Sequence, residues 1–299
     1  MELAYELTQA SGLTLDDCSC VCHRWDARWA LGHDNGESFV VDFQGDDNLV
    51  ERQVPALFTG MWRSASGAVY VSHSGGRMFR RGALGDRWEI VQVADAMYGV
   101  FGLDDRCVYA WGSTGGQPSM FVWEGQAWRA IASPPGFVNA LHGTAPDLLM
   151  AVGSKGLIAH WDGNGWRRMA SPIRTALSSV FVVGVDEAYA CGPGDHALLE
   201  GSVYGWAPIL HHDTPLSAVA KYGGRVYVGA GIHGLHVLDG SALSLVALDL
   251  HAVKLDARGG LLVSAQDRIA YSTDGEDFDW FMVDGVKDLV DRVEPCWGR

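Results

Sequence analysis

Histidine and aspartate are the residue types in this chain that could carry chemistry. The densest group is His211, His212 and Asp213, three adjacent residues that could bind a metal ion or transfer a proton. No motif of the HExxH type accompanies them, and these residue types are also ordinary turn formers. The sequence also holds no G-x-S-x-G or Walker motif. We therefore predict no catalytic centre, no metal site and no cofactor.

A run of alternating cysteines is the second group with possible chemistry. Cys18, Cys20 and Cys22 would point to one face of a strand, where three thiols could bind a soft metal or sense redox conditions. Free cysteine is, however, among the most buried residue types, and zinc sites usually use C-x2-C spacing on two segments. We predict that these cysteines pack in the core, with metal binding and redox sensing as alternatives.

Charge and composition narrow the classes of partner. The formal net charge of −14 disfavours nucleic acid, whose backbone is bound by clustered Lys and Arg, and permits a basic protein partner. No run approaches the roughly 18 apolar residues needed to span a membrane, and the first residues lack a signal-peptide pattern. We therefore expect a cytoplasmic protein with a protein partner, no nucleic acid and no membrane contact.

An internal repeat indicates which elements position these residues. A strand ending in a small residue, a Gly-containing turn, a second strand and then often Trp recur along the chain. The small residues are spaced by 40, 40, 41, 39, 39 and 34 residues, at Gly32, Ser72, Gly112, Gly153, Gly192, Gly231 and Ala265. A period of about 40–45 residues with four strands per unit is typical of propeller blades.

The repeat predicts an all-β protein, a seven-bladed β-propeller of four-stranded antiparallel blades in one domain, 1–299. The expected blades are 13–54, 55–94, 95–133, 134–172, 173–212, 213–249 and 250–285. A strand-like segment at 2–8 precedes them and could close the ring by pairing with the last blade, which would remove exposed strand edges. Trp88, Trp128, Trp166 and Trp206 stand near the start of outer strands, where we expect them to pack between blades.

Two segments carry a family resemblance. AVGSKGLIAHWDGNGW (151–166) and STDGEDFDW (272–280) resemble the WD-repeat/YVTN/BNR-like β-propeller superfamily, which includes Asp-box and photosystem-assembly-factor-like proteins. The resemblance implies the propeller fold along nearly the whole chain. STDGEDFDW is a near match to an Asp box. For this segment the resemblance implies a turn-stabilising role and no catalysis. The arginine triad of sialidase-like propellers has no counterpart that can be carried over.

Strand order assigns each loop to one face of a propeller. The loops between the second and third strands, and those between blades, define one face, here called the rim face. We predict a partner-binding rim there, formed by His33, Asp34, His73, Lys155, Arg174, His196, His211, His212, Asp213, His233 and His251. The remaining loops define the opposite face, whose acidic residues could dock a basic protein: Asp46, Asp47, Asp104, Asp105, Asp186 and Glu187. Both sets also suit ordinary turns.

These observations favour a non-catalytic, protein-binding propeller such as a scaffold, an assembly factor or a toxin-neutralising immunity protein. The alternative is an enzyme or a lectin that acts on or binds a sugar or lactone at the His-rich mouth of the ring. In the lectin case, Trp62, Trp111 and Trp123 could offer stacking faces.

Overall fold

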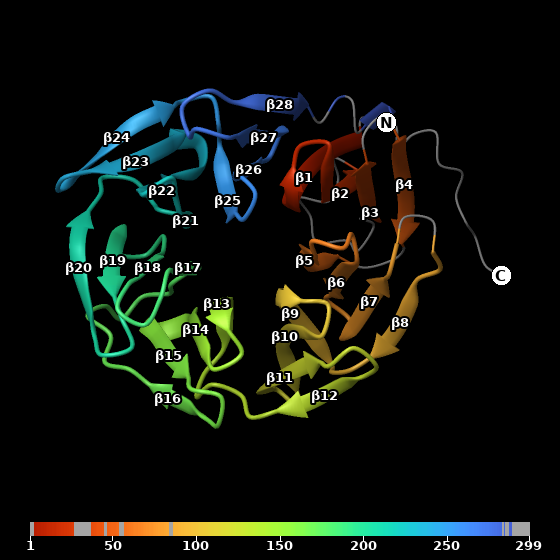
Figure 1. The fold of residues 1–299 in the computed structure, drawn as a ribbon, viewed down its shortest axis with the longest axis horizontal. Coiled ribbons are helices and arrows are strands. Elements are labelled where there is room, and N and C mark those ends of the chain that lie inside the picture. The colour runs from red at the N-terminus through yellow and green to blue at the C-terminus, as the bar shows by residue number, and fades with distance from the viewer. Residues whose placement is uncertain are drawn as a thin grey trace.

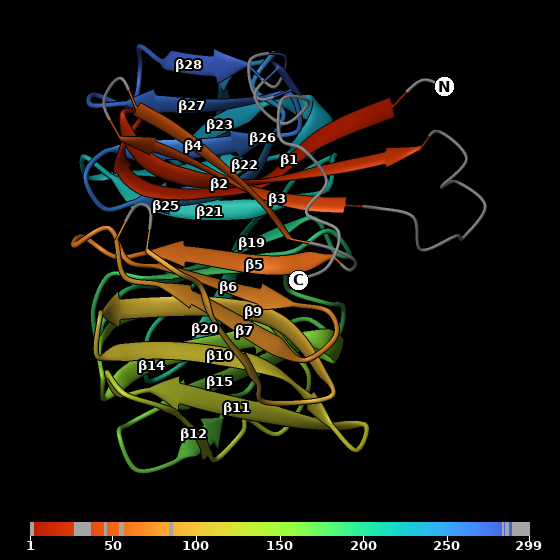
Figure 2. The same ribbon diagram turned by 90° about the vertical axis from the view of Figure 1, so that its right-hand side faces the viewer.

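Seven four-stranded antiparallel sheets form a closed ring, which confirms the predicted seven-bladed β-propeller (Figure 1). The computed structural model describes residues 3–26, 37–44, 47–53, 57–83 and 86–282, together with 284, 287 and 288. The strands run roughly along the ring axis, so their ends lie at the two faces (Figure 2). Among the described residues, no helix is long and apolar enough to cross a membrane.

Each blade takes its four strands from consecutive chain, with the first strand innermost (Figure 1). Blades 1 to 3 consist of β1 (Leu3–Thr14), β2 (Asp17–Asp26), β3 (Glu37–Gln44), β4 (Asp47–Gln53); β5 (Phe58–Arg63), β6 (Val69–His73), β7 (Arg77–Arg81), β8 (Glu89–Gln92); and β9 (Ala96–Asp104), β10 (Cys107–Thr114), β11 (Gln117–Trp123), β12 (Trp128–Ile131). Blades 4 and 5 consist of β13 (Val138–Ala145), β14 (Leu148–Gly153), β15 (Leu157–Trp161), β16 (Trp166–Arg168); and β17 (Ser179–Val182), β18 (Ala188–Cys191), β19 (Ala197–Gly201), β20 (Trp206–His211). Blades 6 and 7 consist of β21 (Ala218–Tyr222), β22 (Arg225–Gly229), β23 (Leu235–Asp239), β24 (Ala242–Ala247); and β25 (Ala252–Ala257), β26 (Leu261–Ala265), β27 (Arg268–Ser272), β28 (Asp279–Met282). Two short 3-10 turns, η2 (Ser154–Gly156) and η3 (Gly231–His233), follow β14 and β22.

The small residues that mark the repeat lie at the ends of the second strands because another chain segment approaches there. A side-chain carbon on Gly153 would lie 1.9 Å from the backbone oxygen of Phe137, and one on Gly192 would lie 2.2 Å from that of Ala176. Both carbonyls belong to the segment that leads into the innermost strand of the same blade. Close packing of that segment therefore selects glycine at these two positions, whereas Gly231 lies in η3 with open space around it and a positive φ of 53°. Gly32 lies outside the described residues.

The first blade differs from the expected arrangement. The N-terminal segment forms β1, which pairs along its length with β2, so Leu3 to Thr8 are the start of the innermost strand of blade 1 and not a fourth strand of blade 7. The blade spans Leu3–Gln53 in place of 13–54. Residues 27–36, which separate β2 from β3, displace the repeat there relative to the other blades.

The seam between blades 7 and 1 is sealed by backbone contacts and by an apolar cluster. The Leu7 N–H donates to the Gln266 oxygen at 3.0 Å, and the Ala10 N–H donates to Ser264 Oγ at 2.8 Å. The cluster joins Cys18, Cys20, Cys22, Phe39, Val41 and Phe43 of blade 1 to Leu262, Ile269 and Tyr271 of blade 7. The three cysteines are fully buried free thiols, which confirms their predicted place in the core.

At several other blade junctions, tryptophans pack at the edge of the apolar cluster. Trp128 packs 6.5 Å from Tyr70 of the preceding blade and 5.9 Å from Trp123, measured between ring centroids. Trp166 begins β16 and donates Nε1–H to the Ala132 oxygen at 3.0 Å. These contacts confirm the predicted packing of outer-strand tryptophans between blades.

A buried ionic cluster joins blades 1 and 2. Asp42 on β3 pairs through Oδ2 with Arg81 of β7 at 2.7 Å and through Oδ1 with Arg63 of β5 at 3.5 Å. Ser19 Oγ donates to the same Oδ1 atom, and Arg63 also pairs with Asp17. Both Asp42 and Arg81 are fully buried, so each charge depends on its partners for the interactions that water would supply.

The Asp-box-like segment forms the tight turn that its sequence predicted. Asp274 Oδ1 accepts the backbone N–H groups of Glu276 at 2.8 Å and Asp277 at 3.0 Å, while Ser272 Oγ accepts that of Gly275 at 2.7 Å. These bonds lower the pKa of Asp274 because they stabilise its charged form. The segment holds the turn between β27 and β28.

Candidate functional site

The innermost strands surround a central cavity of about 140 Å³. Consecutive residues of the inner strands line it, and because side chains alternate along a strand, residues two apart on one strand fall into successive layers. The layer nearer the rim face consists of Gln9, Gly60, Gly99, Ala140, Ser179 and Lys254. The next layer inward consists of Ser11, Trp62, Phe101, His142, Phe181 and Asp256. The intervening residues, such as Met61 and Leu141, are buried between blades.

One-residue bulges turn polar side chains toward the rim end of the cavity. The pairing of β5 with β6 and of β13 with β14 is interrupted at Thr59 and Asn139 respectively. Thr59 Oγ1 lies 3.0 Å from Ser72 Oγ, and Asn139 Nδ2 donates to the Leu177 oxygen of the next blade at 2.8 Å. Because these groups have partners in the protein, we assign them a structural role at the mouth.

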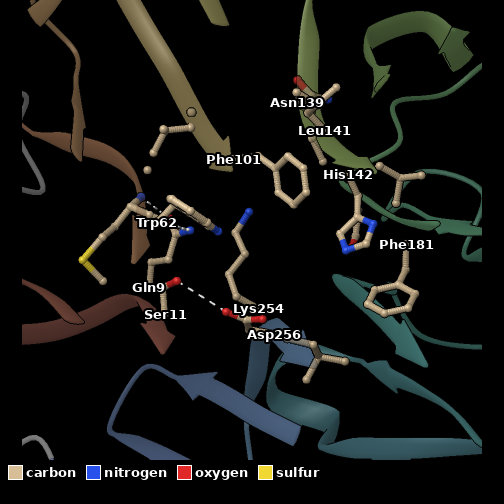
Figure 3. A pocket seen from close by; sticks show the side chains of 18 of the residues that line it. Gln9, Ser11, Trp62, Phe101, Asn139, Leu141, His142, Phe181, Lys254 and Asp256 are labelled. Carbon is tan, nitrogen blue, oxygen red and sulfur yellow. Dashed lines mark hydrogen bonds between the residues drawn. The ribbon is translucent and has the colours of Figure 1, made fainter. Parts of the chain in front are cut away.

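Lys254 is the one long cationic side chain in the layer nearer the rim. Other residues of that layer include Gly60, Gly99 and Ala140. Figure 3 shows its amino group directed into the middle of the cavity, near Trp62 and Phe101. Among the described residues no hydrogen bond or ion pair to Lys254 Nζ occurs.

Lys254 is exposed to water in the channel, with protein around it. The partial loss of hydration lowers the pKa of Lys254, because the charged ammonium loses more hydration than the neutral amine.

The nearest carboxylate in the lining is engaged elsewhere. Asp256 lies two residues further along β25, and Arg258 holds it through Nε at 2.9 Å to Oδ1 and through a terminal nitrogen at 2.6 Å to Oδ2. Arg258 also donates to the Arg63 oxygen at 2.6 Å and to Ser11 Oγ at 2.8 Å, so it connects blades 7, 1 and 2. The cavity lining therefore has two cations and one carboxylate, inside a protein of net charge −14.

An aromatic layer lies inward of Lys254. His142 stacks on Phe181 with ring centroids 4.4 Å apart and lies 5.0 Å from Phe101 (Figure 3). The Val182 N–H of the next blade donates to His142 Nδ1 at 3.0 Å, so Nδ1 acts as the acceptor. Burial lowers the pKa of His142 to about 4, which leaves this ring neutral near pH 7.

A second, apolar hollow opens at the rim face and is here called the rim pocket. It has a volume of about 450 Å³ and is lined by Pro193, Pro215, Leu216, Ala230, Ile232 and Val253 from blades 5 to 7. Ile232, in η3, is 66% exposed at its edge. Ser178 and Lys254 line both this pocket and the central cavity, so the two hollows adjoin.

The predicted rim residues lie in rim-face loops or at the strand ends beside them, but the described ones do not line the central cavity. They are distributed over the blades: His73 ends β6, Lys155 is in η2, Arg174 and His251 lie between blades, His196 precedes β19, His211 ends β20, His212 and Asp213 follow it, and His233 is in η3. Of these, only His233 lines the rim pocket. His33 and Asp34 lie outside the described residues.

Two of these histidines have structural surroundings. His73 is buried against Phe79, and its Nδ1 accepts the Gly75 N–H at 2.9 Å. His212 lies 5.2 Å from His236 between ring centroids, and its Nδ1 is 2.8 Å from Thr214 Oγ1. In the described part of the chain, no group of three His, Cys, Asp or Glu residues is arranged to hold a metal ion. The role of the rim set in partner binding stays a prediction.

The predicted acidic residues belong to loops or strand ends at the opposite face, where several are already paired. Glu187 forms an ion pair with Lys221 and accepts the Tyr189 hydroxyl at 2.7 Å. Asp104 accepts the Arg106 N–H at 2.8 Å, and Asp105 accepts the Ser66 hydroxyl at 2.6 Å. Asp186 lies in the turn between β17 and β18, Asp47 begins β4, and Asp46 lies outside the described residues. Turn formation therefore accounts for much of this acidic set.

The tryptophans considered as stacking faces for a glycan are core residues. Trp62, Trp111 and Trp123 are each about 95% buried. Trp111 covers Gly99, where an added side-chain carbon would lie 2.1 Å from its ring, and Trp62 covers Gly102 in the same way. Their faces are therefore used within the protein.

Sequence reasoning missed Lys254, Asp256, Arg258 and His142. Each occurs once in the ring and does not recur with the blade period, so the repeat gave no signal for it. The shorter spacing of the last repeat unit also left the innermost strand of blade 7 poorly defined. A count of inward positions on each first strand would have found them.

Comparisons with known proteins support the fold. No protein-family model and no curated protein matches the chain. Many solved chains match its structure, among them that of YCF48 bound to D1 peptide. That likeness has a TM-score of 0.61 at 11% sequence identity and covers 94% of each chain. At this identity it concerns the fold alone, and membership of the WD-repeat/YVTN/BNR-like superfamily stays a prediction. The chain is therefore a seven-bladed β-propeller, and YCF48 is one of its structural neighbours.

Proposed function

We propose that this chain is a non-catalytic propeller that binds a segment of a partner protein at its rim face. The rim pocket is the observation that carries the proposal. Its walls are apolar, and Ile232 at its edge is 66% exposed. An apolar hollow with an exposed aliphatic neighbour suits the side chain of a bound peptide, because burial of both surfaces stabilises the complex.

The structural neighbour supports a peptide as the kind of ligand. YCF48, which shares the fold, has a solved structure with a D1 peptide bound. A protein of this fold can thus bind a peptide. Here the rim pocket would accept an apolar side chain, and the rim loops would contact the backbone on either side.

Charge favours a partner segment with basic residues near its binding motif. The net charge of −14 creates a field that speeds the encounter with a positively charged partner. Binding of this kind would serve a scaffold, an assembly factor or a protein that neutralises a toxin. We place such a protein in the cytoplasm.

The proposal can be tested by peptide display on the intact protein. Peptides enriched from a random library would be synthesised, and their affinities measured by calorimetry for the wild type and for Ile232→Asp. We expect Ile232→Asp to weaken binding at least about tenfold, because it places a charge where an apolar contact forms. The matched control is Val185→Asp, since Val185 is 49% exposed in a loop of the opposite face. Equal affinity of Ile232→Asp and the wild type, or loss confined to Val185→Asp, would contradict the proposal.

A further inference from the structure

The central cavity contains a cation without a counter-ion. Lys254 Nζ has no hydrogen bond or ion pair among the described residues, and Arg258 holds Asp256, the carboxylate nearest along the strand. Water reaches Lys254 in the channel, and the protein around the channel strengthens the attraction of its ammonium for an anion relative to bulk water. An anion that enters the cavity would supply the missing partner.

The remaining lining of the cavity limits what that anion is attached to. The aromatic layer of Phe101, His142 and Phe181 lies one step inward of Lys254 and presents flat, apolar surface (Figure 3). The volume of about 140 Å³ is close to that of cavities of about 150 Å³ that bind benzene in other proteins.

Carboxylate is the anion that fits these surroundings best. It needs one strong cationic partner, and its second oxygen can accept from neutral donors nearby, such as Ser179 and Gln9 in the same layer. A phosphate would carry about twice the charge with a single lysine to meet it. The wide rim pocket adjoins the cavity at Lys254 and provides a route by which the group can enter.

We propose that the central cavity binds a carboxylate on a small flat or apolar group, with Lys254 as its cationic partner and the aromatic layer beneath it. The carboxylate can belong to a free small molecule or to the segment bound at the rim. In the second case the inference rests on the proposed function. In the first case it stands alone, and it is therefore tested without a peptide.

The test uses para-fluorobenzoate and its neutral analogue para-fluorobenzamide, each followed by fluorine NMR in the presence of the intact protein at low salt. We expect benzoate to bind with a dissociation constant on the order of 1 mM, and the amide to bind at least about tenfold more weakly. Lys254→Met should lose at least about tenfold in benzoate affinity, whereas Lys254→Arg, which keeps the charge, should stay within a few-fold of the wild type.

Matched controls separate the site from the rest of the surface. Arg129→Met removes an exposed cation of the outer strand β12, outside the cavity and the rim pocket, and should leave benzoate binding unchanged. The melting temperature of Lys254→Met should be no lower than that of the wild type, because the change removes a charge that has no counter-ion and keeps an unbranched side chain of similar length. Equal benzoate affinity of Lys254→Met and the wild type, or no binding in the millimolar range, would overturn the inference.

The peptide and benzoate experiments distinguish the two sources of the carboxylate, and they also separate failure of the cavity inference from failure of the rim proposal. A rim peptide that binds equally well with a free or an amidated C-terminus, and that does not compete with benzoate, assigns the cavity to a separate small molecule. If benzoate fails to bind while peptides still depend on Ile232, the cavity inference fails and the rim proposal stands. If benzoate depends on Lys254 while no peptide is selected, the reverse holds.

Discussion

The ionic cluster between blades 1 and 2 makes a sharp prediction about stability. Asp42 is fully buried and meets two guanidinium groups, Arg81 at 2.7 Å and Arg63 at 3.5 Å, as well as the Ser19 hydroxyl. Asp42→Asn keeps the shape and removes the charge, so two buried cations lose their shared counter-ion. Breaking one partner out of a buried pair typically costs about 3–5 kcal/mol.

We expect the lower end of that range, because asparagine can still accept one hydrogen bond and Asp17 still pairs with Arg63. A loss of roughly 3 kcal/mol corresponds to a fall in melting temperature of roughly 6–12 °C for a domain of a few hundred residues. The measurement is thermal unfolding followed by tryptophan fluorescence, repeated as a urea titration. The control is Glu124→Gln, which removes the carboxylate of the exposed Arg129–Glu124 pair and should leave the melting temperature unchanged.

A double variant distinguishes the ionic explanation from a general packing defect. Arg81→Met in the Asp42→Asn background removes one of the two cations that Asp42 contacts, so the pair of changes should destabilise less than the sum of the single changes. The reasoning about this cluster is refuted if Asp42→Asn has the same melting temperature as Glu124→Gln. It is also refuted if the effects of Asp42→Asn and Arg81→Met on stability simply add in the double variant.

Three further predictions concern packing, acid and thiol chemistry. Gly99→Ala should destabilise the fold by about 1–3 kcal/mol, because its new carbon would meet the Trp111 ring, whereas Gly184→Ala, which has open space around it, should be neutral in urea unfolding. The pKa of His142 is about 4 in the fold against 6.5 in the unfolded chain, so the unfolded state takes up the proton first, and stability should fall as pH drops from 6.5 toward 4. His142→Gln should flatten this dependence of melting temperature on pH; an unchanged slope would show that His142 is not responsible. Among the described cysteines, Cys107 should react first with a thiol reagent at pH 8 in site-resolved mass spectrometry, because the others are buried, and early modification of the β2 cysteines would contradict their burial.

The architecture could be predicted because its cause repeats. Close approach of a backbone carbonyl demands a small residue at Gly112, Gly153 and Gly192, so the same constraint appears in blade after blade. The hairpin turn at Asp162 could be predicted from the sequence for a similar reason, because Asp162 Oδ1 accepts the N–H groups of Asn164 and Gly165. Features that arise from the repeated geometry of a blade leave a periodic trace in the sequence.

The first blade and the cavity could not be predicted in the same way. β1 and β2 are longer than the strands of the other blades, and residues 27–36 shift the repeat, so the segment at 2–8 resembled an additional strand. The side chains that give the cavity its character, Lys254 and His142, depend on their position relative to other blades. Closure of the ring sets that position, and a search for similar segments within the sequence does not reveal which residues then meet.

Strand order assigned each loop to a face but gave little information about the function of its residues. The histidines of the rim set lie in rim-face loops or beside them, as strand order requires, yet the described ones do not line the central cavity. Turn formation explains many polar residues on both faces. The binding surface we propose consists mostly of proline, leucine, alanine and isoleucine, residue types that are common throughout a propeller and therefore carry no signal by themselves.

Binding at the rim face is the central claim, and amide hydrogen exchange of the intact protein with and without a display-selected peptide tests it most directly. Bound peptide should slow exchange at 216–217 and 230–233, which line the rim pocket, and should leave the turn at 183–187 on the opposite face unchanged. Protection confined to 183–187 and the other loops of the opposite face would contradict the claim.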